Sequence, residues 1–489
     1  MPAQEKTTAR ALFLLVCLSI LPGSLARAAL DQQQVFAVAR QQGLSTDRIG
    51  VFVAALSDCK PILAVNESTP MVVASNMKLI TSAAALCMIG ADYEFRTELY
   101  MLGDLDSHGT LDGDLLVRAG ADPNISGRFT GRPTAIFEKW ARALREMGVS
   151  SISGDVIGDD LIFDREFIHP GWPSDQLTFW YAAPVSSLSF NDNCIDLTVI
   201  PAFQAGAPPL IRLSPSTSYI RLENGCVTQE KATKPLVLYR TPGTNNITVR
   251  GHVTQGASPW RGSVTVHNPS LYFVHVLVET LQRCGVTVRG EPRLLRKDES
   301  PAVDAAAPAL LHKSSLVSTI NVMNKRSQNL YAEDIFKLLG HEIVGDGSFR
   351  GGRKAVESFL RDINAYAPGC NISDGSGLSS AGKLAASQLV AVLCHMYRSP
   401  HRLAYVDSLP ASGNDGTLKN RLSGPHMEGK VLAKTGYISG ASALSGYLFP
   451  EKSQPVAFSI IVNGIGPADN SKAKAFQDKL CRILAELVE

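Results

Sequence analysis

The 489-residue sequence predicts an α/β (α+β) fold, in which an antiparallel sheet flanked by helices is split by a β-rich insertion of one or two small domains. Strand-like runs and an apolar helix occur at both ends of the chain, which predicts that the two ends form one domain. Between about residues 91 and 299 the pattern changes to short strands with turn signals roughly every 8 to 12 residues. We therefore predict one domain in two parts, 29–90 and 300–489, separated by the insertion 91–299.

The first part begins with an amphipathic pattern over 31–42, which predicts a surface helix. Apolar residues alternate over 49–56 and a second short apolar run covers 61–65, so we predict two strands. A helix-forming apolar run then continues to residue 89 and ends at Gly90, a residue type that commonly follows a helix.

The second part contains helical patterns, strand-like runs and a terminal helix. The helical patterns cover 318–339, 354–364 and 387–397, and the strand-like runs cover 431–435, 443–449 and 456–462. The last helix begins near residue 471 and places four apolar residues on one face: Phe476, Leu480, Ile483 and Leu487.

The N-terminus has the pattern of a signal peptide over residues 1–28. Lys6 and Arg10 precede an apolar run over 11–21, and small residues precede a cleavage site near Ala28. The apolar run holds about 11 residues, whereas a membrane span needs about 20. The weaker alternative to a signal peptide is that the apolar run 11–21 forms a buried helix of the folded protein. We expect an exported periplasmic protein without a transmembrane anchor.

Charge and cysteine content exclude some classes of function. The formal net charge is +2, and the predicted signal peptide carries it, so the mature chain is nearly neutral. It shows no basic stripe for nucleic acid.

The cysteines permit disulfides, because the nine include Cys17 of the signal peptide and an even number therefore remains in the mature chain. Cys194 with Cys226 is the first disulfide pair to test. Cys87 and Cys481 lie in apolar helical patterns and are expected in the core. No spacing of histidine or cysteine indicates a metal, so we expect neither metal nor cofactor.

The strongest candidate for a catalytic residue is Ser75, in Ser75-Asn76-Met77-Lys78. A serine hydroxyl needs a base within hydrogen-bond reach, and the Gly-x-Ser-x-Gly turn that often accompanies a histidine base is absent. Residues three apart share one face of a helix, so Lys78 can reach the Ser75 hydroxyl. The helix start also favours negative charge that develops on the substrate oxygen. Further SxxK copies at 57–60 and 471–474 lie at a hairpin turn and on a charged helix start, so they are weaker candidates.

Two later tripeptides strengthen this interpretation. Ser327-Gln328-Asn329 lies just before an apolar helical run, and Lys434-Thr435-Gly436 ends a strand-like run. The first pattern is common and recurs at 189–191, but a Lys-Thr-Gly tripeptide is expected only about 0.1 times by chance in a chain of this length. With the Ser75 motif they form the ordered SxxK, SxN and KTG set of class A β-lactamases and penicillin-binding proteins.

Each motif has a chemical role in this interpretation. Ser327 can relay a proton between Lys78 and the leaving amine, and Asn329 can hold a substrate amide. Lys434 offers a cation, and Thr435 a hydroxyl, to a substrate carboxylate.

The end of the third motif is expected to bind the substrate backbone. Gly436 has no side chain, so the substrate backbone can approach it closely. The backbone N–H groups of Ser75 and Tyr437 are the expected oxyanion hole. The convergence of Lys78 and Lys434 on one cleft would lower the pKa of Lys78 toward that of a useful base.

The spacing of the motifs resembles that of the D-alanyl-D-alanine carboxypeptidase/endopeptidase family of penicillin-binding protein 4, peptidase family S13. Ser75 and Ser327 are 252 positions apart, whereas compact β-lactamases have these motifs close together. The resemblance runs from about residue 35 to the C-terminus and includes the segments 113–117, 154–159, 181–188, 374–379 and 409–418. The family often has threonine where Tyr437 stands, so a side-chain contact differs there while the backbone donor is kept.

The resemblance implies a serine β-lactamase/DD-peptidase-like domain in a soluble periplasmic hydrolase. Such an enzyme removes the terminal D-alanine from peptidoglycan stem peptides and cuts D-alanine–diaminopimelate cross-links, and β-lactam antibiotics acylate it. Its partners are muropeptides, and a homodimer is an open option. Its catalytic positions match Ser75, Lys78, Ser327, Asn329 and Lys434.

Other functions fit parts of the sequence. A β-lactamase would share the fold, but the long insertion argues against it. A non-catalytic β-lactam sensor or binding protein would normally keep a membrane anchor, and a structural cell-wall protein with a dead site would not need the three intact motifs. Within the insertion, Asp164 or Phe167 could shape the substrate pocket, although we expect a structural role for both.

Overall fold

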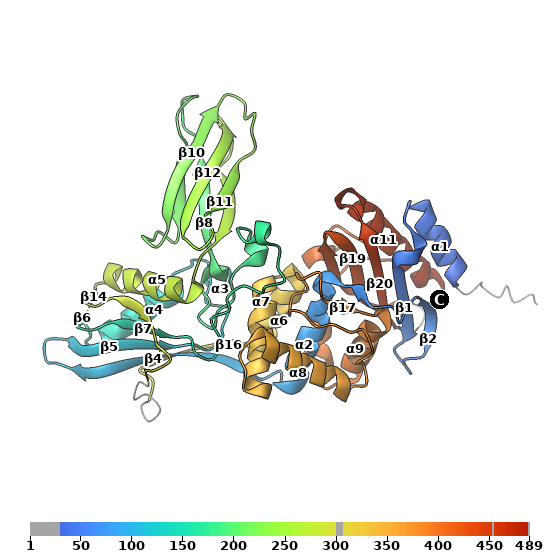
Figure 1. Ribbon diagram of the computed structural model, residues 1–489, viewed down its shortest axis with the longest axis horizontal. Coiled ribbons are helices and arrows are strands. Elements are labelled where there is room, and N and C mark those ends of the chain that lie inside the picture. Colours follow the sequence, from blue (N-terminus) through green and yellow to red (C-terminus); the bar gives the residue numbers. More distant parts are fainter. Residues whose placement is uncertain (1–29, 300–306, 452–453, 488–489) are drawn as a thin grey trace, which may run out of the picture.

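The computed structural model describes residues 30–299, 307–451 and 454–487. Figure 1 shows an elongated molecule in which the two ends of the chain (blue and red) lie together and the insertion (cyan to green) lies at the other side. The predicted signal peptide, 1–28, lies outside the described residues. Within those three ranges, no helix is long and apolar enough to cross a membrane.

Residues from both ends of the chain form one five-stranded antiparallel sheet with the strand order β18-β19-β20-β1-β2. Its strands are β1 (Ile49–Ala55), β2 (Pro61–Val65), β18 (Val431–Ile438), β19 (Gly440–Leu448) and β20 (Val456–Ile465). β1 pairs with β20 along its whole length, from Ile49 opposite Val462 to Ala55 opposite Val456. The N-terminal hairpin is therefore completed by C-terminal strands.

Helices cover both faces of this sheet, and alternate residues of β1 face the two layers. Val51 and Val53 belong to a buried cluster with α1 (Gln32–Gln41) and α11 (Asn470–Leu487), whereas Ala54 belongs to the cluster on the other face. Successive side chains of a strand point to opposite faces, so burial on both sides explains why β1 is almost wholly apolar. Phe476 and Leu480 of α11 are buried, in agreement with the predicted apolar face of the last helix.

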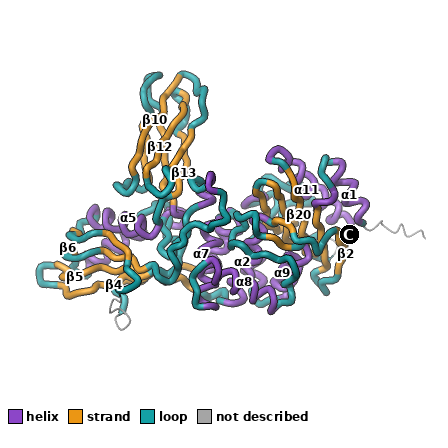
Figure 2. Tube along the Cα trace, in the orientation of Figure 1, coloured by secondary structure: helices purple, strands orange, loops and turns teal. Residues whose placement is uncertain are grey.

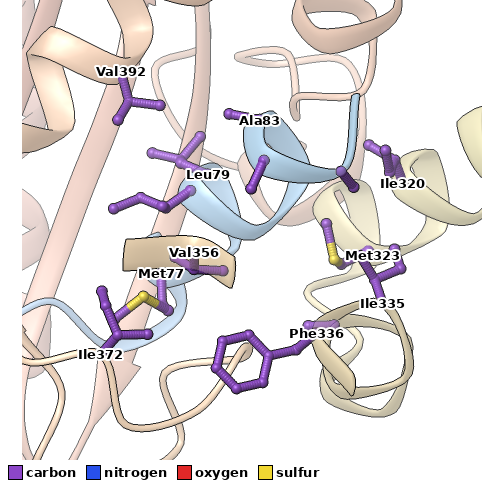
Figure 3. Packing of buried hydrophobic residues seen from close by; sticks show 14 of the residues in the cluster. Met77, Leu79, Ala83, Ile320, Met323, Ile335, Phe336, Val356, Ile372 and Val392 are labelled. Carbon is purple, nitrogen blue, oxygen red and sulfur yellow. The ribbon is translucent and has the colours of Figure 1, made fainter. Parts of the chain in front are cut away.

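The helix α2 (Met77–Met88) is the centre of the second layer, and ten of its twelve residues are buried. Around it lie α6 (Leu316–Arg326), α7 (Asn329–Leu339), α8 (Phe349–Asp362), α9 (Ala386–Arg398) and α10 (Arg402–Asp407). Figure 3 shows residues of α2 packed among apolar side chains of these helices, including Ile320, Met323, Ile335, Phe336, Val356 and Val392. Burial of apolar surface stabilises a fold by about 25 cal/mol per Å², so this contact holds α2 firmly in place.

The insertion begins with a seven-stranded mixed sheet. Its strands are β4 (Glu94–Leu105), β5 (Thr110–Arg118), β6 (Ser151–Ile152), β7 (Val156–Asp159), β14 (Thr287–Val288), β15 (Pro292–Leu294) and β16 (Leu310–Ser315). β4 pairs antiparallel with β5 and β16, whereas β6 and β7 pair parallel with β5. Side chains of α4 (Ala135–Glu146) and α5 (Pro269–Arg283) form the aromatic part of its core, where Phe137 contacts Trp140 and Phe273.

Two three-stranded sheets extend from the insertion as an arm, residues 194–265, seen at the top of Figures 1 and 2. One sheet has the order β13-β8-β9 and the other the order β10-β12-β11. The strands are β8 (Cys194–Ile200), β9 (Leu210–Ser214), β10 (Arg221–Gln229), β11 (Val237–Arg240), β12 (Asn246–Thr254) and β13 (Trp260–Thr265). The short helix α3 (Gly127–Thr130) lies near the base of the arm.

The predicted fold class is confirmed, because an antiparallel sheet flanked by helices is divided by β-rich modules. The limits 29–90, 91–299 and 300–489 stay a prediction, and we note that β16 follows residue 307 but pairs with β4 of the insertion. Both Cys194 and Cys226 have free thiols, so the candidate disulfide between them is not formed. They pack in different buried clusters, which explains their separation. Cys481 is fully buried, as expected, whereas Cys87 is only partly buried.

Candidate active site

Ser75 lies in a tight turn directly before α2. The short strand β3 (Met71–Val72) is followed by a 3₁₀ turn (Ala74–Asn76), and α2 begins at Met77. Ala74 has a left-handed φ of +48°, an uncommon conformation for a non-glycine residue that surrounding structure must hold in place. Ser75 itself is half-buried, so its hydroxyl stands at the helix start and remains accessible.

The amino group of Lys78 is fully buried and meets three oxygen atoms. Its Nζ lies 3.1 Å from Ser75 Oγ, 2.6 Å from Asn329 Oδ1 and 2.8 Å from the carbonyl oxygen of Ser376. Three acceptors match the three N–H donors of an ammonium. Once the amine has lost a proton, its lone pair can accept the Ser75 hydroxyl hydrogen across the same short distance.

Burial makes Lys78 a much weaker base than an ordinary lysine. Removal from water disfavours the charged form and lowers the pKa of Lys78 to about 7, while the nearby carboxylates of Glu333 and Asp374 act in the opposite direction. The sequence-based expectation of a lowered pKa is thus supported in direction. Its main cause is burial rather than repulsion by Lys434.

The second motif occupies the turn between two helices. α6 ends at Arg326, Ser327 has a left-handed φ of +57°, and Asn329 is the first residue of α7. The Asn329 amide donates to the carbonyl oxygen of Tyr181 at 2.7 Å, which connects the motif to the insertion. Its oxygen accepts the hydrogen bond from Lys78, so both ends of this side chain are fixed.

Lys434 binds Ser327 from the opposite side of the site. Its Nζ donates to Ser327 Oγ at 2.8 Å and to the carbonyl oxygen of Thr435 at 2.8 Å. Burial, and next the charge of Lys78, hold the pKa of Lys434 well below its usual range. Ser327 is therefore paired with Lys434 in this structure, whereas the sequence had suggested a direct link to Lys78.

The third motif lies on β18, the edge strand of the sheet, against the Ser75 turn. Asn76 donates its amide to the carbonyl oxygen of Lys434 at 2.8 Å. A Cβ at Gly436 would come within 2.7 Å of the Val73 carbonyl oxygen and 3.2 Å of the Ser75 nitrogen. The close approach predicted at this glycine is thus made by the protein's own turn, which places β18 beside Ser75.

Thr435 of the third motif is partly exposed, and Tyr437, the residue after the motif, is exposed. Thr435 donates its hydroxyl hydrogen to Thr417 Oγ1 at 2.8 Å, which adds a hydroxyl that the sequence did not single out. Tyr437 is 43% exposed. The structure therefore brings Ser75, Lys78, Ser327, Asn329 and Lys434 together around one turn, with Thr435, Gly436 and Tyr437 along the adjacent edge strand.

Two buried carboxylates support the site and were missed by sequence reasoning. Glu333 accepts hydrogen bonds from the backbone N–H groups of Gly375 and Ser376, both at 2.8 Å, and so fixes the carbonyl oxygen that Lys78 contacts. Burial raises the pKa of Glu333 to about 8. Asp374 accepts from the backbone of Gly377 at 2.8 Å and from the Trp172 indole at 3.0 Å.

A signal for these residues was present in the sequence. Glu333 is four positions after Asn329, one helical turn along the same face of α7. Asp374 and Ser376 lie in the segment 374–379, which carried part of the resemblance. By contrast, Asp164 accepts a hydrogen bond from the buried Lys337 at 2.5 Å, a contact within the fold.

Comparisons with known proteins identify the family and the fold of the chain. Residues 31–487 match the D-Ala-D-Ala carboxypeptidase 3 (S13) family. The chain is 33% identical over 484 residues to a D-alanyl-D-alanine carboxypeptidase of Actinomadura sp. strain R39, covering 96% of this chain and 87% of the relative. Its fold is similar to the crystal structure of penicillin binding protein 4 from Haemophilus influenzae, with a TM-score of 0.80, 24% identity, and coverage of 92% and 99% of the two chains. A predatory peptidoglycan endopeptidase of Bdellovibrio bacteriovorus is also similar in fold, with a TM-score of 0.51, 15% identity, and coverage of 90% and 92%.

Proposed function

The chain belongs to the D-Ala-D-Ala carboxypeptidase 3 (S13) family, and on that premise we propose that it is a serine D-Ala-D-Ala carboxypeptidase and endopeptidase of peptidoglycan. The observation that carries the proposal is the 3.1 Å contact between Ser75 Oγ and the buried Lys78 Nζ, whose pKa is about 7. A neutral amine at this position can take the serine proton near neutral pH, which converts the hydroxyl into a nucleophile.

Acylation follows from the geometry. Neutral Lys78 takes the Ser75 proton while Oγ attacks the carbonyl carbon of the penultimate D-alanine. The backbone N–H groups of Ser75 and Tyr437 form the proposed oxyanion hole. As the C–N bond breaks, the Ser327 hydroxyl gives its proton to the leaving amine and recovers one from Lys434, 2.8 Å away. Before deacylation, Lys78 releases the proton it took to solvent and Lys434 takes one up. Neutral Lys78 then accepts a proton from the water that attacks the ester and returns it to Ser75 Oγ as the ester bond breaks, which releases the shortened peptide.

The leaving residue is recognised by its carboxylate. Lys434 supplies positive charge, and the hydroxyls of Thr435 and Thr417 lie 2.8 Å from one another at the open edge of β18. A terminal D-alanine and the corresponding residue of a cross-link both carry a carboxylate at this place. A β-lactam also combines an amide with a carboxylate, so the same contacts explain acylation by penicillin.

We further propose that the protein acts in the periplasm after removal of residues 1–28. Peptidoglycan lies outside the cytoplasmic membrane, and the N-terminal pattern predicts export. The substrates are muropeptides, and no cofactor is required for this mechanism.

The test combines labelled penicillin with monomeric and cross-linked muropeptides. We expect long-lived labelling of the mature protein, release of D-alanine from pentapeptides, and cleavage of dimers. The Ser75→Ala variant should lose all three. Fast turnover of penicillin without muropeptide cleavage would overturn the peptidase assignment in favour of a β-lactamase, and persistent labelling of Ser75→Ala would overturn the choice of nucleophile.

A further inference from the structure

A cleft of about 1660 Å³ lies between the insertion and the helices that carry the second motif. One wall contains Arg128 and Asp192 of the insertion and Arg261 of the arm, and the other contains Arg326, Gln328 and Thr417. We propose that this cleft binds the second stem peptide of a cross-linked substrate, the strand that leaves when the cross-link is cut. The assignment rests on the proposed function and names the part of the protein that would make it an endopeptidase.

The cleft starts where the carboxylate of the leaving residue is expected. Thr417 lines it and bonds to Thr435 of the third motif. Gln328 also lines it and lies between Ser327 and Asn329 of the second motif. A ligand that enters from the Thr435 side therefore passes directly from the carboxylate site into the cleft.

The chemistry of the two substrates explains why such space is needed. In a pentapeptide, the leaving residue is D-alanine, whose side chain is a methyl group. In a cross-link, the leaving residue has the same D-configured carboxylate and amine, but its side chain continues into a second stem peptide. The additional atoms must therefore lie on the leaving side of the carboxylate site, which is where the cleft opens.

Gln328 provides an unpartnered polar atom buried behind the wall of this cleft. Its side chain is only 3% exposed, and its Nε2 donates to Asp192 Oδ2 at 2.9 Å. Its Oε1 is buried and has no hydrogen-bond partner within the described residues. A buried acceptor without a partner costs about 1–3 kcal/mol, so a turn of the Gln328 amide that brought Oε1 to a peptide N–H in the cleft would be favoured.

The cleft is lined by four basic and four acidic side chains, and the positive charge that a carboxylate could meet is local to two arginines on opposite walls. Arg128 pairs with Asp192, and Lys325 donates to Asp415 at 2.6 Å, so these four charges are matched. Arg261 and Arg326, one on each wall, are exposed, and their side chains have no ion pair or hydrogen bond in the described parts of the chain. Stem peptides carry several free carboxylates, and an arginine binds a carboxylate through two parallel hydrogen bonds.

The test uses charge-reversed variants of the two free arginines. In Arg261→Glu, Arg326→Glu and the double variant, we expect kcat/KM for a cross-linked muropeptide dimer to fall about fivefold to tenfold per substitution. Release of D-alanine from a monomeric pentapeptide and acylation by labelled penicillin should stay within about twofold of the parent. Arg250→Glu, an exposed arginine of β12 outside the cleft, is the matched control and should leave dimer cleavage unchanged.

The outcomes separate the cleft from the proposed function. Dimer cleavage that is indifferent to both substitutions would overturn the cleft assignment alone, and so would an equal fall in dimer cleavage, pentapeptide cleavage and penicillin acylation. A parent enzyme that releases D-alanine but leaves dimers intact would overturn the endopeptidase half of the proposed function, and the cleft assignment with it. A selective loss of dimer cleavage supports both.

Discussion

At the scale of single residues, the site depends on how a buried lysine is held. Lys78 is removed from water, and its three hydrogen-bond partners come from different parts of the chain: Ser75, Asn329 and Ser376. Burial lowers its pKa to about 7, and the carboxylate of Glu333 limits that fall. The same carboxylate positions the Ser376 carbonyl through two backbone hydrogen bonds. Glu333 is therefore expected to act through Lys78 rather than on the substrate.

The pH dependence of acylation should report the protonation of Lys78. The reactive form is the neutral amine, so kcat/KM for penicillin acylation should rise with pH and level off above a midpoint near 7. Glu333→Gln removes the carboxyl group whose ionised form raises the pKa of Lys78, so the midpoint should move to lower pH. The shift should be small, because burial raises the pKa of Glu333 itself to about 8 and its charge is only partly present near pH 7. The plateau should also fall about tenfold, because an amide nitrogen replaces one of two backbone acceptors.

The control for that measurement is Glu146→Gln, an exposed residue at the end of α4. Its midpoint and plateau should match those of the parent. A midpoint that stays constant or rises in Glu333→Gln would show that Glu333 does not set the pKa of Lys78. A lower plateau with an unmoved midpoint would reduce its role to holding the loop 374–376.

At the scale of secondary-structure elements, two elements meet at Gly436. The edge strand β18 carries the third motif, and the 3₁₀ turn before α2 carries Ser75. They approach so closely that an added Cβ would lie 2.7 Å from the Val73 carbonyl oxygen, which requires the strand or the turn to move. The close approach of β18 to the Ser75 turn, and with it the alignment of the proposed oxyanion donors, thus depends on the absence of a side chain.

Gly436→Ala should separate the strand from the turn. We expect a loss of about 1–3 kcal/mol in the free energy of unfolding, the usual cost of overpacking, and a fall of at least about tenfold in penicillin acylation. Gly225→Ala is the matched strand glycine in the insertion, where the nearest atom to an added Cβ is 3.4 Å away. Chemical denaturation and labelling kinetics measure the two effects. Equal acylation by both variants would contradict a role for this contact.

At the scale of the whole molecule, the insertion is part of the site rather than a separate module. Tyr181 of the insertion accepts the hydrogen bond from Asn329. Asp192 pairs with Arg128 and accepts from the side chains of Gln328 at 2.9 Å and Tyr331 at 3.4 Å. These contacts anchor the helix turn of the second motif to the insertion, so the two parts should lose stability together.

Asp192→Ala tests this coupling. It leaves Arg128 without its ion-pair partner and Gln328 without its acceptor, and we expect a loss of about 1–3 kcal/mol in the free energy of unfolding together with slower acylation. Asp104→Ala, at an exposed aspartate near the far end of β4, should change neither. Thermal unfolding and penicillin labelling are the measurements. Normal acylation in a destabilised Asp192→Ala variant would show that the insertion only supports the fold.

Much of the architecture could be predicted from local patterns. The strand β1 and the helix α2 both lie where the apolar runs of the sequence place them, although β1 is buried on both faces rather than on one. The candidate disulfide between Cys194 and Cys226 is not formed, and two cysteines in sequence do not reveal in which buried cluster each will pack. The partner of Ser327 and the support from Glu333 also lay beyond local patterns.

The sequence by itself determined which chemical groups are present and which of them a helix must bring together. Ser75 and Lys78 face each other because three residues make nearly one helical turn. Only the tertiary structure decided that Lys78 is buried, that Ser327 pairs with Lys434, and that a cleft opens beside Gln328. These features depend on contacts between segments more than a hundred residues apart, and burial sets the pKa that makes a lysine a base.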